Sequence, residues 1–308
     1  MAAGAGSEEE MNNRAQIRIL ADGRRLHLHD GPMDLVVEAF GAPDEIEKAY
    51  RAASARFVTV LDELCAELSF LRQACREEAE WPRGAVARRM TAAVRPYASR
   101  CFITPMAAVA GAVADEILET MISGAQLARA YVNDGGDIAL HLAEDEKFVV
   151  GMVERPDRAS LFGTTTLTSR GPVRGVATSG WRGRSFSLGI ADAVTVLADR
   201  AAAADAAATI IANAVDLPGH PAIVRVPACE LAPDSDLGEL LVTQAVGELT
   251  FEEVDRALSA SARIAELLLR MGLIRSAALN LQRETRVVGM LDESRSIASV
   301  QERGLVHA

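Results

Sequence analysis

The amino-acid sequence predicts an α+β fold, in which a mixed or mainly antiparallel sheet and packed helices surround one cleft. Apolar residues three or four positions apart predict long helices at 44–75 and 105–121. Short segments of strand type at 130–142, 147–154 and 164–168 are not separated by helices in a regular βαβ order. Because parallel neighbours need a crossover connection, this order favours antiparallel pairing.

The composition allows a large buried core and argues against two classes of partner. The chain has 308 residues, of which 49% are hydrophobic, enough for one large domain or two closely joined lobes. Its net charge of −11 and its aromatic content of 4% argue against nucleic acid or an anionic membrane as the main partner.

The sequence shows no targeting or membrane-spanning pattern. The first residues lack the basic and apolar regions of a signal peptide, and no uncharged apolar run reaches about 18 residues. The four cysteines lack the spacing of a zinc site, so we expect buried free thiols in a reducing compartment. We therefore expect a soluble, cytoplasmic protein.

The chain divides into one folded region and two tails. We expect residues 1–13 to be a disordered tail and residues 291–308 to be a polar tail. Residues 14–290 are expected to form a single α+β domain, with two lobes as the alternative. Within it, a turn of Asp-Gly type predicts a hairpin between 16–21 and 25–29.

Two helices have recognisable first residues. Pro105 begins one, and the small residues at 107–115 leave its backbone open to close approach by a ligand or by another helix. Thr250 and Glu253 form a capping box that begins a second helix, which ends near Gly272.

A glycine pair joins two of the predicted strands. The turn reads Asn133-Asp134-Gly135-Gly136-Asp137. Such glycines supply a tight turn, or they leave backbone N–H groups facing a phosphate, and the sequence leaves both readings open. Further along, residues 278–288 predict one closing strand.

Residues 173–215 are the stretch around which we expect the rest of the chain to be organised. The apolar run 193–198 predicts a buried strand, and the alanine-rich run 201–215 predicts a helix that is buried on most sides. Its polar residues Asp205, Thr209 and Asn213 share one face. A buried carboxylate needs a cation or several donors, so this face is either a solvated stripe or a site. The lack of Lys, Glu and Arg on it favours a site.

Four segments, in this order, resemble motifs of the ApbE-like superfamily, whose best-known members are FAD:protein FMN transferases. Residues 109–115 (Val-Ala-Gly-Ala-Val-Ala-Asp) are similar to its Ala-Lys-Gly-Tyr-Ala-Val-Asp helix. Residues 132–138 (Val-Asn-Asp-Gly-Gly-Asp-Ile) are similar to its Val-Asn-Leu-Gly-Gly-Asp-Ile turn. Residues 176–180 match its Val-Ala-Thr-Ser-Gly strand end, and residues 204–209 resemble its Ala-Asp-Ala-Leu-Ala-Thr helix start.

This resemblance implies a metal and a nucleotide-like ligand. Asp205 and Thr209 would be oxygen ligands of Mg²⁺, with a main-chain carbonyl near Val109, and hard oxygen ligands suit this ion. The ligand would be FAD, FMN or a related phosphorylated molecule. The residues expected to line its cleft are Asn133, Gly135, Gly136, Asp137, Thr178, Ser179 and Gly180.

The chain departs from the family pattern at two places. Ala110 stands where the family has a lysine, and we expect Arg182 and Arg184 to take its place beside the phosphates, unless they are ordinary surface arginines. Residues 185–192 read Ser-Phe-Ser-Leu-Gly-Ile-Ala-Asp in place of the family's His-Ile-Ile-Asp-Pro-Arg-Thr-Gly. The candidate catalytic residues of this segment are Ser187 and Asp192, the latter with a structural capping role as the alternative.

Three hypotheses of function follow from the residues and the resemblance. The variant segment resembles that of an uncharacterised cytoplasmic branch linked to sulfur assimilation into homocysteine. We expect a binder of a flavin, nucleotide-like or phosphorylated ligand, or a non-catalytic partner in that pathway. A Mg²⁺-dependent FMN transferase or FAD pyrophosphatase, acting on a phosphoanhydride, is the enzymatic alternative. The third is a fold whose site has become purely structural. The apolar helix faces also suit a homodimer.

Overall fold

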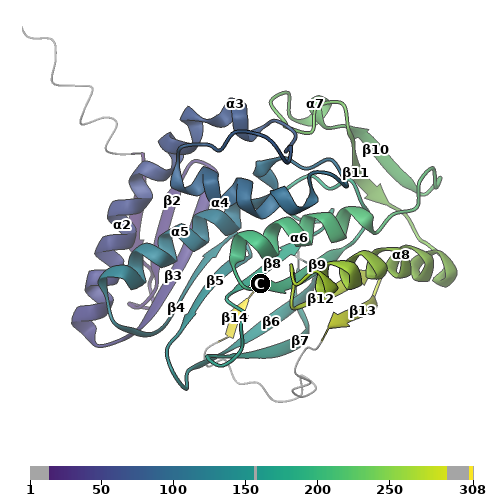
Figure 1. The fold of residues 1–308 in the computed structure, drawn as a ribbon. Coiled ribbons are helices and arrows are strands. Elements are labelled where there is room, and N and C mark those ends of the chain that lie inside the picture. Colours follow the sequence, from purple (N-terminus) through teal and green to yellow (C-terminus); the bar gives the residue numbers. More distant parts are fainter. Residues whose placement is uncertain (1–13, 156–157, 290–304, 308) are drawn as a thin grey trace, which may run out of the picture.

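A nine-stranded sheet forms the centre of the protein (Figure 1). The computed structural model describes residues 14–155, 158–289 and 305–307. The strand order is β1-β2-β3-β4-β5-β8-β9-β12-β13, and all neighbouring pairs are antiparallel. The predicted α+β fold with a mainly antiparallel sheet is therefore confirmed.

The strands of this sheet lie in space in the order in which the chain makes them. Their bounds are β1 (Gln16–Ile19), β2 (Leu26–Asp30), β3 (Met33–Gly41), β4 (Leu127–Asp134), β5 (Asp137–Leu142), β8 (Gly175–Ser179), β9 (Ala193–Ala198), β12 (Ser276–Leu281) and β13 (Glu284–Gly289).

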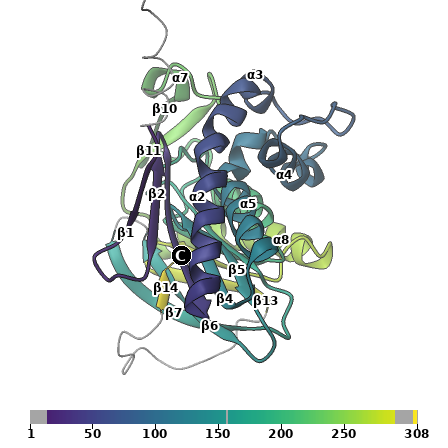
Figure 2. The same cartoon turned by 90° about the vertical axis from the view of Figure 1, so that its left-hand side faces the viewer.

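Helices cover one face of the sheet (Figures 1 and 2). Helix α2 (Pro43–Ala66) packs on β2 and β3, and Figure 2 shows it running alongside these strands. Helix α5 (Val109–Gly124) packs on β4 and β5, and α6 (Ala201–Ala214) on β8 and β9, while α8 (Phe251–Arg270) contacts β12 and β13. The shorter helices are α3 (Leu68–Leu71), α4 (Ala85–Val94), η1 (Arg95–Tyr97), η2 (Pro105–Ala108) and α7 (Ala228–Leu231).

Two small sheets complete the fold. Strands β6 (Lys147–Arg155) and β7 (Arg158–Thr168) pair with each other, and β14 (Leu305–His307) adds to β6 in parallel. Phe148 and Val150 of β6 pack with Ile138 and Val176, so this small sheet covers the face opposite the helices. Strands β10 (Ile223–Pro227) and β11 (Leu241–Val246) form a separate antiparallel ribbon.

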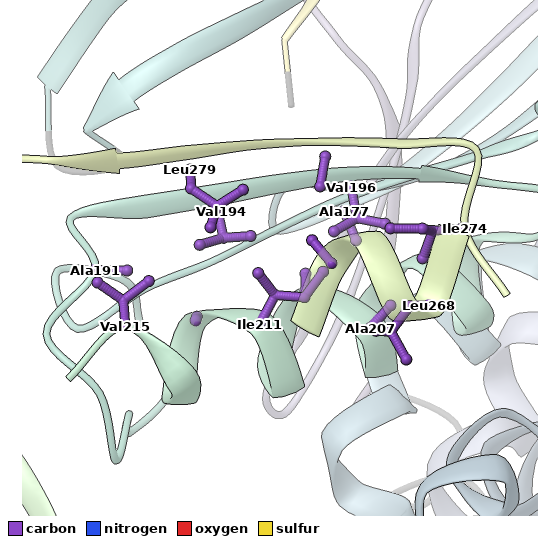
Figure 3. Packing of buried hydrophobic residues seen from close by; sticks show 14 of the residues in the cluster. Ala177, Ala191, Val194, Val196, Ala207, Ile211, Val215, Leu268, Ile274 and Leu279 are labelled. Carbon is purple, nitrogen blue, oxygen red and sulfur yellow. The ribbon is translucent and has the colours of Figure 1, made fainter. Parts of the chain in front are cut away.

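Helix α6 lies in the core because its sequence is almost entirely small and apolar. Figure 3 shows Ile211 of α6 among side chains of the sheet and of α8. All six residues of β9 are buried, as expected for a continuous apolar run covered on both faces. The labelled members of this cluster are Ala177, Ala191, Val194, Val196, Ala207, Ile211, Val215, Leu268, Ile274 and Leu279.

Helices α5 and α6 touch through their first turns. A β-carbon added at Gly111 would overlap the carbonyl group of Ala201, so only glycine allows this approach. The Asp115 carboxylate accepts hydrogen bonds from the N–H groups of Ala201 (3.1 Å) and Ala202 (3.0 Å) and so caps α6. Of the two readings of the small residues at 107–115, the structure favours helix packing.

Several sequence predictions at the level of elements were wrong. The first long helix ends at Ala66 instead of continuing to Cys75. The next residue, Glu67, leaves helical geometry, and its carboxylate accepts hydrogen bonds from the N–H groups of Arg83 and Gly84, both at 2.7 Å. Strands β3, β10 and β11 were not predicted. The predicted single strand at 278–288 is the hairpin β12–β13.

Other expectations stand as follows. None of the four cysteines is bridged, but Cys65 and Cys101 are exposed and Cys75 and Cys229 only half-buried, so the expectation of buried thiols was wrong. No helix in the described part of the chain is long and apolar enough to span a membrane. The predicted tail at 1–13 lies outside the described residues, as does the predicted tail at 291–308 apart from β14.

Candidate functional site

Three carboxylates gather where the β4–β5 turn faces helix α6. Asp134 and Asp137 lie directly opposite each other in the β4–β5 register. Asp134 is two residues beyond Val132, which packs under α5, so strand alternation turns this carboxylate toward the helices. Asp205 of α6 interacts electrostatically with both strand carboxylates. The group is called the carboxylate cluster below: Asp134, Asp137 and Asp205.

Asp134 is buried and Asp137 and Asp205 are half-buried, and the negative charges of the three carboxylates oppose one another. Burial raises the pKa of Asp134 to about 7, although the Arg184 guanidinium acts to lower it. Burial also holds the pKa of Asp137 well above its usual value, and the charges of Asp205 and Asp134 add to the effect. The pKa of Asp205 is raised first by burial and then by Asp134 and Asp115. Such a group is stabilised by a cation or by protons.

Asp205 is placed by the first turn of α5. The Gly111 N–H donates a hydrogen bond of 3.1 Å to Asp205 Oδ2, and Val109 lies two residues earlier as the first residue of α5. Thr209 follows Asp205 by one helical turn and is half-buried. The structure thus brings together the predicted metal ligand Asp205 and the first turn of α5, which begins at Val109.

The third polar residue of the α6 face serves the fold. Asn213 Oδ1 accepts hydrogen bonds from the Leu188 N–H (2.9 Å) and the Ser187 hydroxyl (3.2 Å). The Ser187 hydroxyl accepts a further bond of 3.2 Å from the Gly189 N–H, and Ser187 is only 2% exposed. These hydrogen bonds hold Ser187 in position in the loop that precedes β9.

In the glycine turn, one of the backbone N–H groups already has a hydrogen-bond partner within the turn. Asn133 Oδ1 accepts a hydrogen bond of 2.8 Å from the Gly136 N–H, so this amide is already used by the turn. Gly135 has φ +65° and is exposed. A β-carbon there would overlap the guanidinium of Arg184, which therefore lies against the bare backbone of the turn.

The end of β8 joins the carboxylate cluster through its backbone. The Thr178 N–H donates a hydrogen bond of 3.3 Å to Asp137 Oδ1. The Thr178 hydroxyl pairs with that of Thr195 at 2.8 Å. Ser179 is half-buried, and a β-carbon at Gly180 would lie 2.6 Å from the carbonyl oxygen of Asp192, so the chain needs glycine there.

Arg182 and Asp192 form a partly buried ion pair that fixes the 180–192 loop. Arg182 Nε donates to Asp192 Oδ1 at 2.6 Å, and the Gln282 N–H donates to Asp192 Oδ2 at 2.7 Å. The Arg182 guanidinium also lies over the Trp181 ring, 4.2 Å from its centroid. Both oxygens of Asp192 are engaged, which favours the structural alternative for this residue over a catalytic one.

The oxygen atoms available here suit a hard cation that completes its coordination shell with ligands from outside the protein. Among residues 14–155, 158–289 and 305–307, no three His, Cys, Asp or Glu side chains are arranged to hold a metal. Mg²⁺ commonly takes one or two carboxylates and completes its shell with water and phosphate. Asp205 and Thr209 fit that requirement. A surface hollow of about 770 Å³ lies elsewhere, lined by residues that include Phe70, Cys75 and Pro105.

Sequence reasoning missed three residues here. Asp134 completes the carboxylate cluster, Gly111 holds Asp205, and Asp115 caps α6. The signal for Asp134 was its even spacing from the apolar residues Ala130 and Val132 on one face of the strand.

One family model and several curated proteins match this chain. The family model described as AbpE bacteria matches residues 17–287. A UPF0280 protein of Methanosarcina acetivorans is 35% identical over 187 residues, which make up 59% of this chain and 70% of that protein. A UPF0280 protein of Methanosarcina barkeri is 41% identical over 117 residues, 37% of this chain and 44% of the relative.

A third relative, the UPF0280 protein of Methanopyrus kandleri, is 38% identical over 128 residues, covering 42% of this chain and 48% of its own length. The chain thus spans about half the length of several curated relatives that it matches. Because the family model covers most of the chain, the protein belongs to this ApbE-related family.

Proposed function

We propose that the protein binds a phosphorylated or nucleotide-like ligand together with Mg²⁺, beside the β4–β5 turn and α6. The observation that carries this proposal is the carboxylate cluster, three acidic side chains held together at a cost in stability with an exposed arginine beside them. Strongly perturbed carboxylates of this kind are frequent at functional sites.

Each part of the ligand has a suitable group in this chain. Asp205, Thr209 and a carbonyl near Val109 are the ligands we propose for Mg²⁺, which would polarise a phosphoryl oxygen when bound. The ion would offset the repulsion within the carboxylate cluster. Arg184 is the phosphate partner that we favour over Arg182, because Arg182 is already paired with Asp192. FAD, FMN and ADP are candidate ligands through the resemblance to the ApbE-like superfamily.

Binding without turnover is the form of this function that we favour. Ser187 and Asp192, the two candidate catalytic residues, both have their polar atoms engaged in hydrogen bonds of the fold. A catalytic base would need a free acceptor within reach of the ligand. The Mg²⁺-dependent transferase or pyrophosphatase is the second candidate, supported by the Asp205 and Thr209 pair on one helix face.

Calorimetric titration tests the proposal directly. FAD, FMN and ADP are titrated into the wild type, Asp205→Ala and Asp199→Ala, each with and without Mg²⁺. Asp199 is an exposed aspartate paired with Arg275, so it controls for the loss of one carboxylate. We expect Mg²⁺-dependent binding that weakens at least about tenfold in Asp205→Ala, or about 1.4 kcal/mol, and not in the control. Failure of every nucleotide to bind folded wild type would refute the proposal.

A further inference from the structure

Arg184 is held differently from its neighbour Arg182. Arg182 is 24% exposed at its side chain, paired with Asp192 and stacked on Trp181. Arg184 is exposed, and in the described part of the chain it forms no ion pair and no hydrogen bond. Its position is set by close contact with the backbone of Gly135. The side chain is therefore well placed and weakly held.

The electrostatic setting of Arg184 explains why it lies there. Its guanidinium interacts favourably with Asp134 and Asp137 across the turn. The charges that act on Asp205 are negative and come from Asp134, within the carboxylate cluster, and from Asp115, outside it. Arg184 is thus a cation beside a group of carboxylates, attracted to Asp134 and Asp137 without forming a salt bridge.

Gly135 makes this arrangement possible. With φ +65° it adopts a backbone conformation that glycine tolerates easily, and it offers no side chain, so the guanidinium rests on the chain itself. Gly219 has a similar φ of +73° but no atom within 4 Å of an added β-carbon. The two glycines share a backbone requirement, and only Gly135 has an arginine against it.

We infer that Arg184 is a movable counter-ion of the site, and that a divalent cation and this guanidinium exclude each other from the margin of the carboxylate cluster. The inference rests on the proposed function and adds a role for one residue. Arg184 acts on Asp134 and Asp137 and the proposed ion on the neighbouring Asp205, so the two cations repel each other more strongly the closer they lie. The divalent ion displaces Arg184, which then turns its five N–H donors to the phosphate of the ligand.

The test measures Mg²⁺ affinity by calorimetry with no nucleotide present. Arg184→Gln removes the guanidinium, and Gly135→Ala pushes it aside while leaving its charge in the protein. The matched controls are Arg170→Gln, an exposed arginine after β7, and Gly219→Ala, which carries the same backbone strain. We expect Mg²⁺ to bind about fivefold to tenfold more tightly to both test variants, and with wild-type affinity to both controls.

Two further measurements sharpen the result. Arg184→Lys keeps the charge and is expected to keep Mg²⁺ affinity near that of the wild type, since the ammonium can take the same place. Trp181 lies three residues before Arg184, so its fluorescence in a Trp81→Phe background should change on addition of Mg²⁺ as the loop shifts. The exchange predicts that Arg184→Lys differs from Arg184→Gln in Mg²⁺ affinity and that the fluorescence changes, whereas a purely structural role for Arg184 predicts neither.

The outcomes separate this inference from the proposed function. Unchanged Mg²⁺ affinity in both test variants would overturn the exchange, as would tighter binding in Arg184→Gln alone, because that points to long-range charge without contact at Gly135. The exchange is also wrong if neither the wild type nor any variant binds Mg²⁺. Nucleotide binding that depends on Asp205 would survive each of these results, so the proposed function is judged separately.

Discussion

At the scale of single residues, Asp134 shows what sequence reasoning lacks. Its carboxylate is buried because α6 lies above the β4–β5 turn, and the two elements are about seventy residues apart in the chain. The turn motif was visible in the sequence, and so was Asp137. The sequence does not show which residues of the turn meet Asp205, because that depends on strand register and on where the helix packs.

Asp134 gives a prediction for the pH dependence of stability. Its folded pKa of about 7 lies above its usual value of 3.8. The folded protein therefore gains stability from protonation of Asp134 at low pH and loses that stability as pH rises through about 7. We expect Asp134→Asn to melt at a higher temperature than wild type near pH 8, with a gain of up to about 4 kcal/mol in unfolding free energy.

The measurement is thermal denaturation of both proteins between about pH 5 and pH 8. The charged groups that face Asp134 are Asp34, Asp137, Asp205 and Arg184, and they are unchanged by the substitution. Asp145→Asn, at an exposed carboxylate, is the control. If Asp134→Asn and wild type show the same pH dependence, Asp134 does not titrate in this range.

Ser187 and Asp192 illustrate a second limit at this scale. A serine and an aspartate in a variant loop are reasonable catalytic candidates from sequence. Their partners, Asn213 and the backbone of Gln282, lie 26 and 90 positions further along the chain. A hydrogen bond between such distant residues follows from the tertiary fold, so the sequence alone could not separate the structural reading from the catalytic one.

At the scale of elements, the contact between α5 and α6 is what positions the candidate site. The helices themselves could be predicted, because Pro105 marks one start and the alanine-rich run marks the other helix. The contact between the two helices could not be predicted, because small residues allow close approach by a ligand and by a neighbouring helix equally well. The structure shows that Gly111 meets Ala201 and that Asp115 caps α6.

This contact predicts opposite effects for two glycine substitutions on α5. Gly111→Ala forces a β-carbon against the Ala201 carbonyl group, and we expect it to cost about 2 kcal/mol or more in spite of the better helix propensity of alanine. Gly124→Ala meets no atom within 4 Å and is expected to be neutral or stabilising. Urea denaturation measures the unfolding free energy of both variants. Equal values would mean that the two helices can move apart at little cost in free energy.

The missed strands have identifiable causes. The run Met33–Gly41 contains three consecutive buried positions and so lacks the strict alternation of a half-exposed strand. The β12–β13 hairpin was hidden because its turn residues, Gln282 and Arg283, have positive φ angles of 48° and 73° without being glycine or asparagine. Tertiary contacts hold this turn, including the bond from the Gln282 N–H to Asp192.

At the scale of the whole molecule, the hydrophobic clusters share one sheet. Ile211 belongs to the cluster under α6 and α8, and Ile117 to the cluster under α2 and α5. Strands β4 and β5 contribute to clusters on both faces. A single domain over residues 14–290 is therefore expected to unfold in one cooperative step, whereas two lobes would melt separately.

Calorimetry of two core variants tests this expectation. Ile211→Ala and Ile117→Ala each empty a fully buried position in a different cluster, and each should cost about 3 kcal/mol. Both are expected to shift one common transition to lower temperature. Ile264→Ala, at a position 36% exposed, should change it little. A second transition in either core variant would show that the clusters unfold as separate lobes.

The sequential order of the central sheet also bears on how the protein is made. As the chain leaves the ribosome, each strand from β2 onward meets a partner that has already been synthesised. The carboxylate cluster is complete once α6 has emerged. The turn that anchors Asp192, and with it the loop of Arg182 and Arg184, comes only with Gln282, which follows α6 in the chain. The nascent chain therefore assembles its acidic residues before it fixes the arginine loop.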